Sequence, residues 1–190
     1  MKRIAIFASG SGSNAENIIR FFSDSAEIKV VLVLTNNPNA KVIDRAKKLN
    51  VSYKVFNRVD LNSSEEFLKF LVNEVDYIIL AGFLWLMPKR IIDQFQNKII
   101  NIHPALLPKY GGKGMFGMNV HQTVIVNREK ETGITIHYVN ENYDEGAIIF
   151  QKNFKIELED TPESIADKIH QLEYKYFPKV IESVILKDEF

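Results

Sequence analysis

The sequence predicts an α/β protein built on a mostly parallel open sheet with helices on both faces. Short β-branched apolar runs alternate along the chain with segments whose apolar residues recur at helical spacing. The runs are apolar almost throughout, which is typical of parallel strands that are covered on both sides. The chain has 190 residues, so we expect a single domain spanning residues 1–190.

The first half of the chain provides five strands and the helices between them. Apolar runs predict strands at residues 3–8, 28–34, 52–56, 77–81 and 98–102. Helical spacing predicts helices at residues 14–22, 41–49 and 63–73, and a short helix after Pro88. Ser63 and Glu66 have the spacing of a capping box, which would begin the third of these helices.

The pattern changes after the fifth strand. A glycine-rich loop at residues 111–118 leads into a helix at residues 119–127. Residues 133–140 and 147–156 predict a C-terminal antiparallel hairpin, joined by a polar loop. Thr161 can cap a long final helix that has Pro162 at its first position.

Composition excludes several classes of protein. Lys plus Arg equals Asp plus Glu at 24 each, so the bulk charge gives no reason to expect a nucleic-acid partner. The absence of cysteine excludes disulfides, thiolate nucleophiles and Cys-based metal sites, and it fits a cytoplasmic protein. No apolar run reaches transmembrane length and no secretory signal is evident, so we expect no membrane partner.

A glycine loop follows the first strand. Residues 10–15 match the G-x-G-x-x-A pattern of dinucleotide sites, but that reading needs an acidic residue after the second strand, where Thr-Asn-Asn stands at residues 35–37. The backbone amides of Gly12, Ser13 and Asn14, at a helix N-terminus, could instead hold one phosphate group. A tight turn without a ligand is the alternative.

Asn101 and His103 end the fifth strand. Residues two apart on a strand point the same way, so both side chains can face one pocket. An amide can donate to a developing oxyanion, and an imidazole can move protons near neutral pH. Asp144 follows a later strand and would favour the imidazolium if the strands are neighbours. Each of the three could also be an ordinary residue with local hydrogen bonds.

Other polar residues are less informative alone. His137 is expected to be a hydrogen-bonded histidine within a strand, and His170 with Glu173 is typical of a solvated helix face. None of the histidines has H-E-x-x-H or paired helical spacing, so no metal site is expected. There is no G-x-S-x-G motif to supply a serine nucleophile. Residues 81–88 end the fourth strand with large apolar groups, which could cover a flat ligand or belong to the core.

Together these segments resemble the folate-dependent formyltransferases, and among them the branch that acts on glycinamide ribonucleotide. The resemblance covers nearly the whole chain and is carried by residues 10–14, 80–83, 101–110, 137–139 and 143–146 and by Glu173. It implies a Rossmann-like formyltransferase fold. It also implies transfer of the formyl group of 10-formyltetrahydrofolate to the amine of phosphoribosylglycinamide in purine biosynthesis, without a metal.

The resemblance also implies roles for particular residues. Asn101, His103 and Asp144 would be catalytic. The ribonucleotide would contact Gly12, Ser13, Asn14, Lys109 and Glu173, and the folate would contact Leu84, Trp85, Leu86, Met87, Asn101 and Val139. The alternatives are formyl transfer to another amine and a nucleotide-binding module without chemistry. The partners are expected to be small molecules, and the protein is expected to be a monomer or a homodimer.

Overall fold

A mixed seven-stranded sheet runs through the part of the chain that the structure, a computed structural model, describes, which is residues 1–187. Its order is β3-β2-β1-β4-β5-β6-β7. The strands are β1 (Lys2–Phe7), β2 (Ile28–Thr35), β3 (Ser52–Val55), β4 (Tyr77–Leu80), β5 (Ile99–His103), β6 (Glu131–Tyr138) and β7 (Ile148–Lys155). The first five are parallel, β6 is antiparallel to β5, and β7 is antiparallel to β6. The predicted sheet and hairpin are confirmed.

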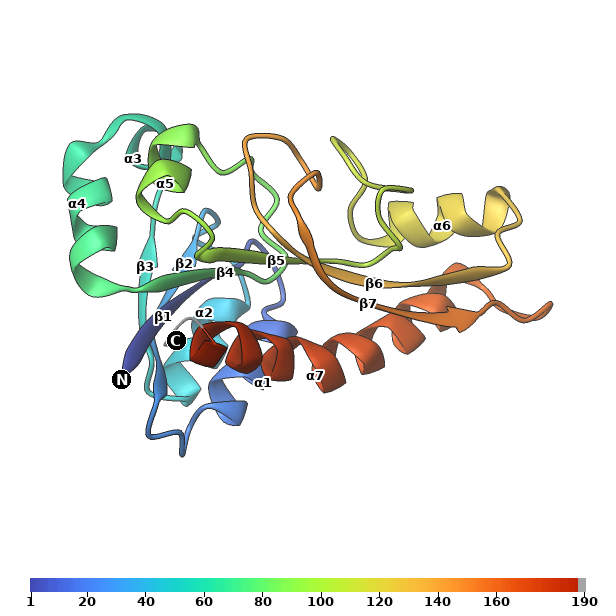
Figure 1. Ribbon diagram of the computed structural model, residues 1–190, viewed down its shortest axis with the longest axis horizontal. Helices are drawn as coiled ribbons and strands as arrows, with labels where there is room; N and C mark the ends of the chain where they lie inside the picture. The colour runs from blue at the N-terminus through green and yellow to red at the C-terminus, as the bar shows by residue number, and fades with distance from the viewer. Residues whose placement is uncertain (188–190) are drawn as a thin grey trace.

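Helices cover both faces of the sheet, as predicted. They are α1 (Ser13–Phe21), α2 (Val42–Lys48), α3 (Arg58–Ser63), α4 (Glu65–Glu74), α5 (Lys89–Gln94), α6 (Met118–Val126) and α7 (Pro162–Lys187). Figure 1 shows α1, α2 and α7 on one side of the sheet and α3, α4 and α5 on the other. Along β1 the side chains alternate between two cores: Ile4 and Ile6 pack with the first group of helices, and Ala5 and Phe7 with the second.

The helix starts differ from the prediction in one place. The capping box of Ser63 and Glu66 is wrong, because Ser64 is the N-cap of α4. A real capping box begins α3, a helix that the sequence pattern did not indicate. There Asn57 Oδ1 accepts from the Asp60 N–H at 3.0 Å, and Asp60 Oδ2 accepts from the Asn57 N–H at 2.9 Å.

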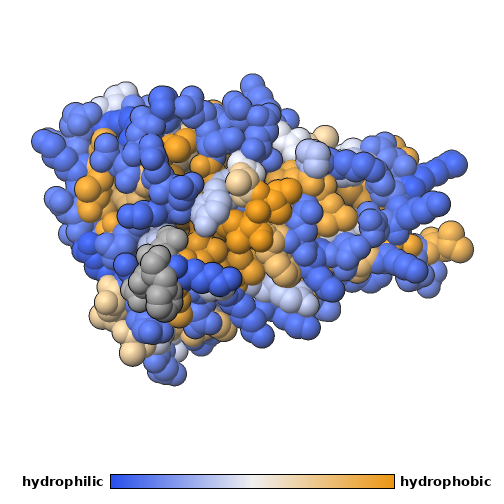
Figure 2. All heavy atoms as spheres, in the orientation of Figure 1, coloured by the Kyte–Doolittle hydropathy of each residue, from blue (hydrophilic) through white to orange (hydrophobic). Residues whose placement is uncertain are grey.

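The final helix begins as expected. Pro162 is its first residue, and Thr161 Oγ1 accepts a hydrogen bond from the Ser164 N–H at 3.2 Å. The helix packs along β5, β6 and β7. No helix within residues 1–187 combines the length and the apolar character needed to cross a membrane. On the face drawn in Figure 2, hydrophilic residues cover most of the surface, and apolar residues gather near the centre.

The pairing of β5 with β6 positions the polar residues of interest. Asn101 pairs with His137, and His103 pairs with Thr135. Paired residues lie on the same face of a sheet, so these four side chains share one face. Their apolar neighbours on the two strands, such as Ile102, point to the opposite face and join the core beneath α7. The antiparallel register therefore gathers a polar cluster on one face only.

Candidate active site

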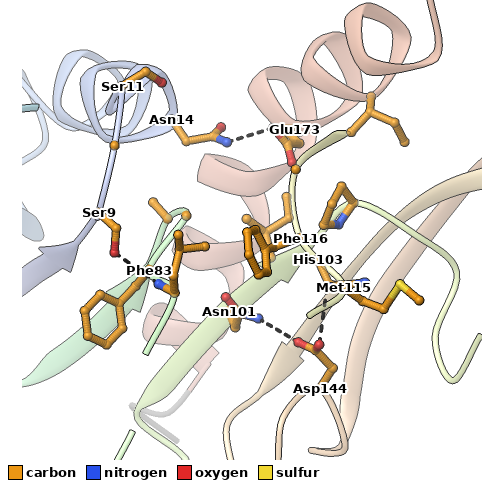
Figure 3. A pocket seen from close by; sticks show the side chains of 18 of the residues that line it. Ser9, Ser11, Asn14, Phe83, Asn101, His103, Met115, Phe116, Asp144 and Glu173 are labelled. Carbon is orange, nitrogen blue, oxygen red and sulfur yellow. Dashed lines mark hydrogen bonds and ion pairs between the residues drawn. The ribbon is translucent and has the colours of Figure 1, made fainter. Parts of the chain in front are cut away.

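A cavity of about 640 Å³ lies at the carboxyl ends of the parallel strands β1, β4 and β5. This is the edge at which open α/β sheets bind ligands. Its walls are formed by residues 9–14, 81–84, 101–104 and 112–117, together with His121, Tyr143, Asp144, Ile169, His170 and Glu173. Figure 3 shows Asn101, His103 and Asp144 near one end, and Asn14 with Glu173 near the other.

The orientation of the Asn101 amide is fixed by His137. The Nδ1 of His137 lies 2.8 Å from the carbonyl oxygen of Tyr138, so Nδ1 must donate and Nε2 is left as an acceptor. Asn101 Nδ2 lies 3.0 Å from that Nε2 and 3.4 Å from Asp144 Oδ1. The amide therefore directs its two N–H groups to His137 and Asp144, and its contact with Asp144 is the longer one.

His103 is buried between two acceptors. Its Nε2 lies 2.7 Å from the carbonyl oxygen of Tyr110, so Nε2 carries a proton, and its Nδ1 lies 3.5 Å from Asp144 Oδ2. Burial lowers the pKa of His103, and the Asp144 charge and the hydrogen bond to Tyr110 only partly oppose this. The ring is therefore mainly neutral near pH 7 in the free protein, with an unprotonated Nδ1 facing a carboxylate.

Asp144 remains ionised although its side chain is only 12% exposed. Burial alone would raise its pKa, but the nearby imidazoles of His137 and His103 and the Gly112 N–H, which donates at 2.9 Å, together hold the pKa below its usual value. The loop that carries Asp144 lies against the glycine-rich loop after β5. A Cβ at Gly111 would lie 3.1 Å from the Asp144 Cβ, so the glycine lets the two loops approach closely without displacing either one.

The N-terminus of α1 forms the other end of the cavity. Gly12, with φ +71°, is the N-cap residue, and no side chain in the described part of the chain caps the helix. Asn14 Nδ2 donates to Glu173 Oε2 at 2.8 Å, and the Asn14 Oδ1 is buried without a hydrogen-bond partner among residues 1–187. Unpaired backbone N–H groups and an unpaired amide oxygen are therefore available to a polar ligand.

The reading of Glu173 as part of a solvated helix face is wrong. Glu173 is 6% exposed, whereas His170, one turn earlier, is exposed at the cavity rim. Burial raises the pKa of Glu173, and the Asn14 hydrogen bond partly opposes the shift. The long helix α7 passes under the cavity, so one turn of it contributes a buried acid instead of a surface charge.

Several of the predicted contact residues lie elsewhere. Lys109 does not line the cavity, and its Nζ pairs with Glu129 at 2.9 Å. Leu84 lines the cavity, but Trp85, Leu86, Met87 and Val139 do not. Met87 is buried in the core on the α3–α5 face. Trp85 packs against neighbouring aromatic rings, and the Arg58 guanidinium carbon lies 4.4 Å from the centroid of the Trp85 ring. In the corner after β4, Ala81 and Met87 thus belong to the core, whereas Leu84 and Leu86 are exposed.

Sequence reasoning missed three residues of this site. His137 was expected to have a local role, but it orients Asn101; pairing β5 with β6 in register would have revealed it. Tyr110 contributes a backbone carbonyl, which no residue pattern indicates. His121 lines the cavity, is 3% exposed, and has its pKa lowered to about 4 by burial and by the charges of His170 and His103. Within residues 1–187, no group of three His, Asp or Glu side chains is placed to hold a metal.

Comparison with known proteins identifies the family. Residues 2–181 match the sequence model of the family described as Formyl transferase. The chain is 37% identical over 191 residues to a phosphoribosylglycinamide formyltransferase of Bacillus subtilis, covering 97% of this chain and 95% of that protein. It is 36% identical to a chloroplastic phosphoribosylglycinamide formyltransferase of Arabidopsis thaliana, of which it spans 65%.

Solved structures agree with the sequence comparison. The crystal structure of phosphoribosylglycinamide formyltransferase from Bacillus halodurans matches with a TM-score of 0.83 at 34% identity, over 97% of this chain and 95% of that one. Glycinamide ribonucleotide transformylase 1 from Geobacillus kaustophilus matches with a TM-score of 0.86 at 35% identity, over 97% and 99%. In sequence and in fold, the chain belongs to the formyl transferase family.

Proposed function

We propose that this chain transfers the formyl group of 10-formyltetrahydrofolate to the amine of phosphoribosylglycinamide. The observation that carries the proposal is the convergence of Asn101, His103 and Asp144 at one end of a cavity whose other end is an uncapped helix N-terminus. The relatives named phosphoribosylglycinamide formyltransferase support the same reaction.

The ribonucleotide binds across the end formed by α1 and α7. The free backbone N–H groups of Ser13 and Asn14 and the positive end of the α1 dipole suit a phosphate. Glu173 and the unpaired Asn14 Oδ1 are acceptors for ribose hydroxyls. This arrangement directs the glycinamide amine along the cavity toward Asn101 and His103.

The formylfolate is the second substrate, and the cavity suits it. Phe83 and Leu84 supply apolar surface beside the polar cluster, as a flat heteroaromatic ring requires. The residues 81–84 that line the cavity continue β4, so they approach the cluster from a neighbouring parallel strand. The donor contributes the formyl carbon, and the protein positions it against the amine.

His103 and Asp144 manage the proton of the attacking amine. The neutral ring accepts it at Nδ1, because Nε2 already donates to Tyr110. The imidazolium that forms then lies 3.5 Å from the ionised Asp144, which stabilises it. The same proton can pass to the nitrogen of the folate as it departs, so the ring acts first as base and then as acid.

Asn101 stabilises the oxygen of the formyl group. As the amine attacks, negative charge develops on that oxygen, and an N–H donor becomes worth about 3–4 kcal/mol in the transition state. Asn101 keeps its bond to His137 and redirects toward this oxygen the hydrogen that now makes the long contact with Asp144. His137 therefore holds the amide in the donating orientation throughout.

The decisive experiment supplies the purified protein with both substrates and follows deformylated folate and formylated ribonucleotide. Equal amounts of the two products are expected. Loss of the formyl group without ribonucleotide would indicate hydrolysis, and transfer to other amines at equal efficiency would indicate a different acceptor. Ribonucleotide binding without turnover would indicate a nucleotide-binding module.

We also infer the assembly and the cellular location of the protein. The residues proposed to contact the two substrates all line one cavity of a single chain, which is compatible with a monomer or a homodimer. A cytoplasmic location agrees with the absence of cysteine. Size-exclusion chromatography with light scattering and cell fractionation test these two inferences.

A further inference from the structure

A hydrogen-bonded network outside the cavity fixes the loop that follows His103. Thr135 Oγ1 donates to the carbonyl oxygen of Ala105 at 2.6 Å and accepts from the Leu107 N–H at 3.0 Å. Gln151 Nε2 donates both to Thr135 Oγ1 at 2.8 Å and to the carbonyl oxygen of Leu107 at 3.0 Å. Every donor and acceptor of the Thr135 hydroxyl is thereby used.

This network bears on His103 through the loop. His103 pairs directly with Thr135 across β5 and β6, and its Nε2 donates to the carbonyl of Tyr110, seven residues further along the same loop. Tyr110 has a φ of +60°, a strained conformation for a residue other than glycine, so its carbonyl direction depends on the surrounding contacts. Its phenol donates to Glu129 at 2.7 Å, which fixes the far end of the loop.

We propose that Gln151, on β7 outside the cavity, is a positioning residue that sets the orientation and tautomer of the His103 ring by fixing the loop that carries its acceptor, the Tyr110 carbonyl. The proposal rests on the function proposed above, in which a neutral His103 with a free Nδ1 takes the proton of the amine. Without the Gln151 amide, both the Leu107 carbonyl oxygen and the Thr135 hydroxyl oxygen lose the N–H group that donates to them.

The chain provides a matched control two residues along the same strand. Asn153 Nδ2 donates to Glu131 Oε2 at 2.6 Å, and Asn153 pairs with Gly133 just as Gln151 pairs with Thr135. Both amides therefore lie on the same face of β7, but only the Gln151 amide bonds to the loop. Gln151→Met and Asn153→Leu each remove one such amide and keep a side chain of similar length.

The experiment measures kcat, both KM values, and the imidazole ¹⁵N signals of His103, assigned with a His103→Asn variant. Wild type is expected to show the neutral Nε2–H tautomer at about pH 7.5. Gln151→Met is expected to give a mixture of tautomers and to lower kcat by about tenfold or more, with both KM values within about threefold, since small misplacements of a catalytic group are costly. Asn153→Leu should match wild type in every measurement.

Wild-type kcat and unchanged His103 signals in Gln151→Met would overturn the proposal. Gln151→Glu is the second variant: it keeps the polarity and length of the side chain but cannot donate at neutral pH, and it is expected to behave like Gln151→Met. The ¹⁵N signals need no substrate, so they test the positioning role even if the reaction proves to be a different one.

Discussion

The Asp144 carboxylate lies 3.5 Å from the Nδ1 of His103, and backbone groups hold both side chains in this relation. The Gly112 N–H fixes Asp144, and the Tyr110 carbonyl fixes the opposite nitrogen of His103. The carboxylate thus faces the one ring nitrogen that can gain a proton, as expected for a base whose charged form must be stabilised only during the reaction.

Replacement of Asp144 by Asn tests this relation. The Asp144 charge raises the pKa of His103, so its loss lowers that pKa further. The neutral ring is the reactive form, and activity is lost as the pH falls through the pKa of His103. We therefore expect kcat to fall by about 100-fold and the acidic limb of the pH profile to move to lower pH, as measured from kcat/KM between about pH 5 and pH 9. Glu145→Gln, beside it in the same loop, is the control; an acidic limb that stays in place would contradict the assignment.

The role of Asn101 gives a second prediction. Asn101→Ala removes the donor to the developing oxyanion, so kcat should fall by about 100- to 1,000-fold while both KM values change little. Steady-state kinetics with both substrates measure this, and thermal unfolding checks that the fold is intact. Asn142→Ala, which removes a surface amide bonded to Glu145, should keep full activity. A loss of less than tenfold for Asn101→Ala would rule out the oxyanion role.

The glycine loop offers a matched pair of substitutions. A Cβ at Gly12 would lie 2.8 Å from the Val42 Cα, and the φ of +71° disfavours any side chain there. A Cβ at Gly10 would meet no atom of residues 1–187 within 4 Å. We expect Gly12→Ala to raise the KM for the ribonucleotide by about tenfold or more and to lower the melting temperature, and Gly10→Ala to do neither. Equal effects of the two substitutions would show that the geometry at Gly12 is not what matters.

Lys109 provides a prediction of no effect. Its ammonium pairs with Glu129 on the outside of the loop, and exposed ion pairs of this kind contribute little to stability. Lys109→Met should leave the KM for the ribonucleotide within about twofold of wild type, whereas Glu173→Gln should raise it. Initial-rate kinetics at varied ribonucleotide concentration decide the matter. A large rise in the KM for the ribonucleotide in Lys109→Met would instead support the contact between Lys109 and the ribonucleotide that the resemblance implied.

His121 is expected to link stability to pH. Its pKa is about 4 in the folded protein and about 6.5 in the unfolded chain, so the unfolded state binds the proton more tightly. The stability associated with a neutral His121 is fully present above about pH 6.5 and is lost as the pH falls toward 4, a loss of about 3 kcal/mol in the free energy of unfolding. Urea unfolding at several pH values should show a shallower loss for His121→Asn than for wild type. Asn142→Ala, which removes an exposed amide that bonds to Glu145, should follow wild type. Identical curves for all three proteins would refute the prediction.

Much of the fold was predictable because its signals are local. Apolar runs located all seven strands to within about two residues, and the caps at Thr161 and Pro162 located the last helix. The short helix α3 was missed because its capping box is Asn-x-x-Asp and its apolar face is narrow. The shift of a predicted cap from Ser63 to Ser64 reflects two adjacent serines that sequence alone does not distinguish.

The site was predictable only in part. Asn101 and His103 were found because both lie on one strand, where spacing decides direction. His137 and Gln151 depend on which strands become neighbours, and that is decided by tertiary packing. Lys109 and Met87 were predicted through the resemblance to contact the substrates. In the structure, the Lys109 ammonium pairs with Glu129, and the Met87 side chain lies in the hydrophobic core. Backbone contributors such as the Tyr110 carbonyl leave no trace in residue type.

The β5–β6 ladder has a consequence for how this protein can fail. His137 and Asn101 are a cross-strand pair. If β6 shifted by one residue relative to β5, His137 and Thr135 would therefore point into the hydrophobic core beneath α7, and Ile134 and Ile136 would point toward the cavity. A misaligned conformer would thus be inert and poorly packed at once. Catalytic activity therefore requires that β6 has paired with β5 in the correct register.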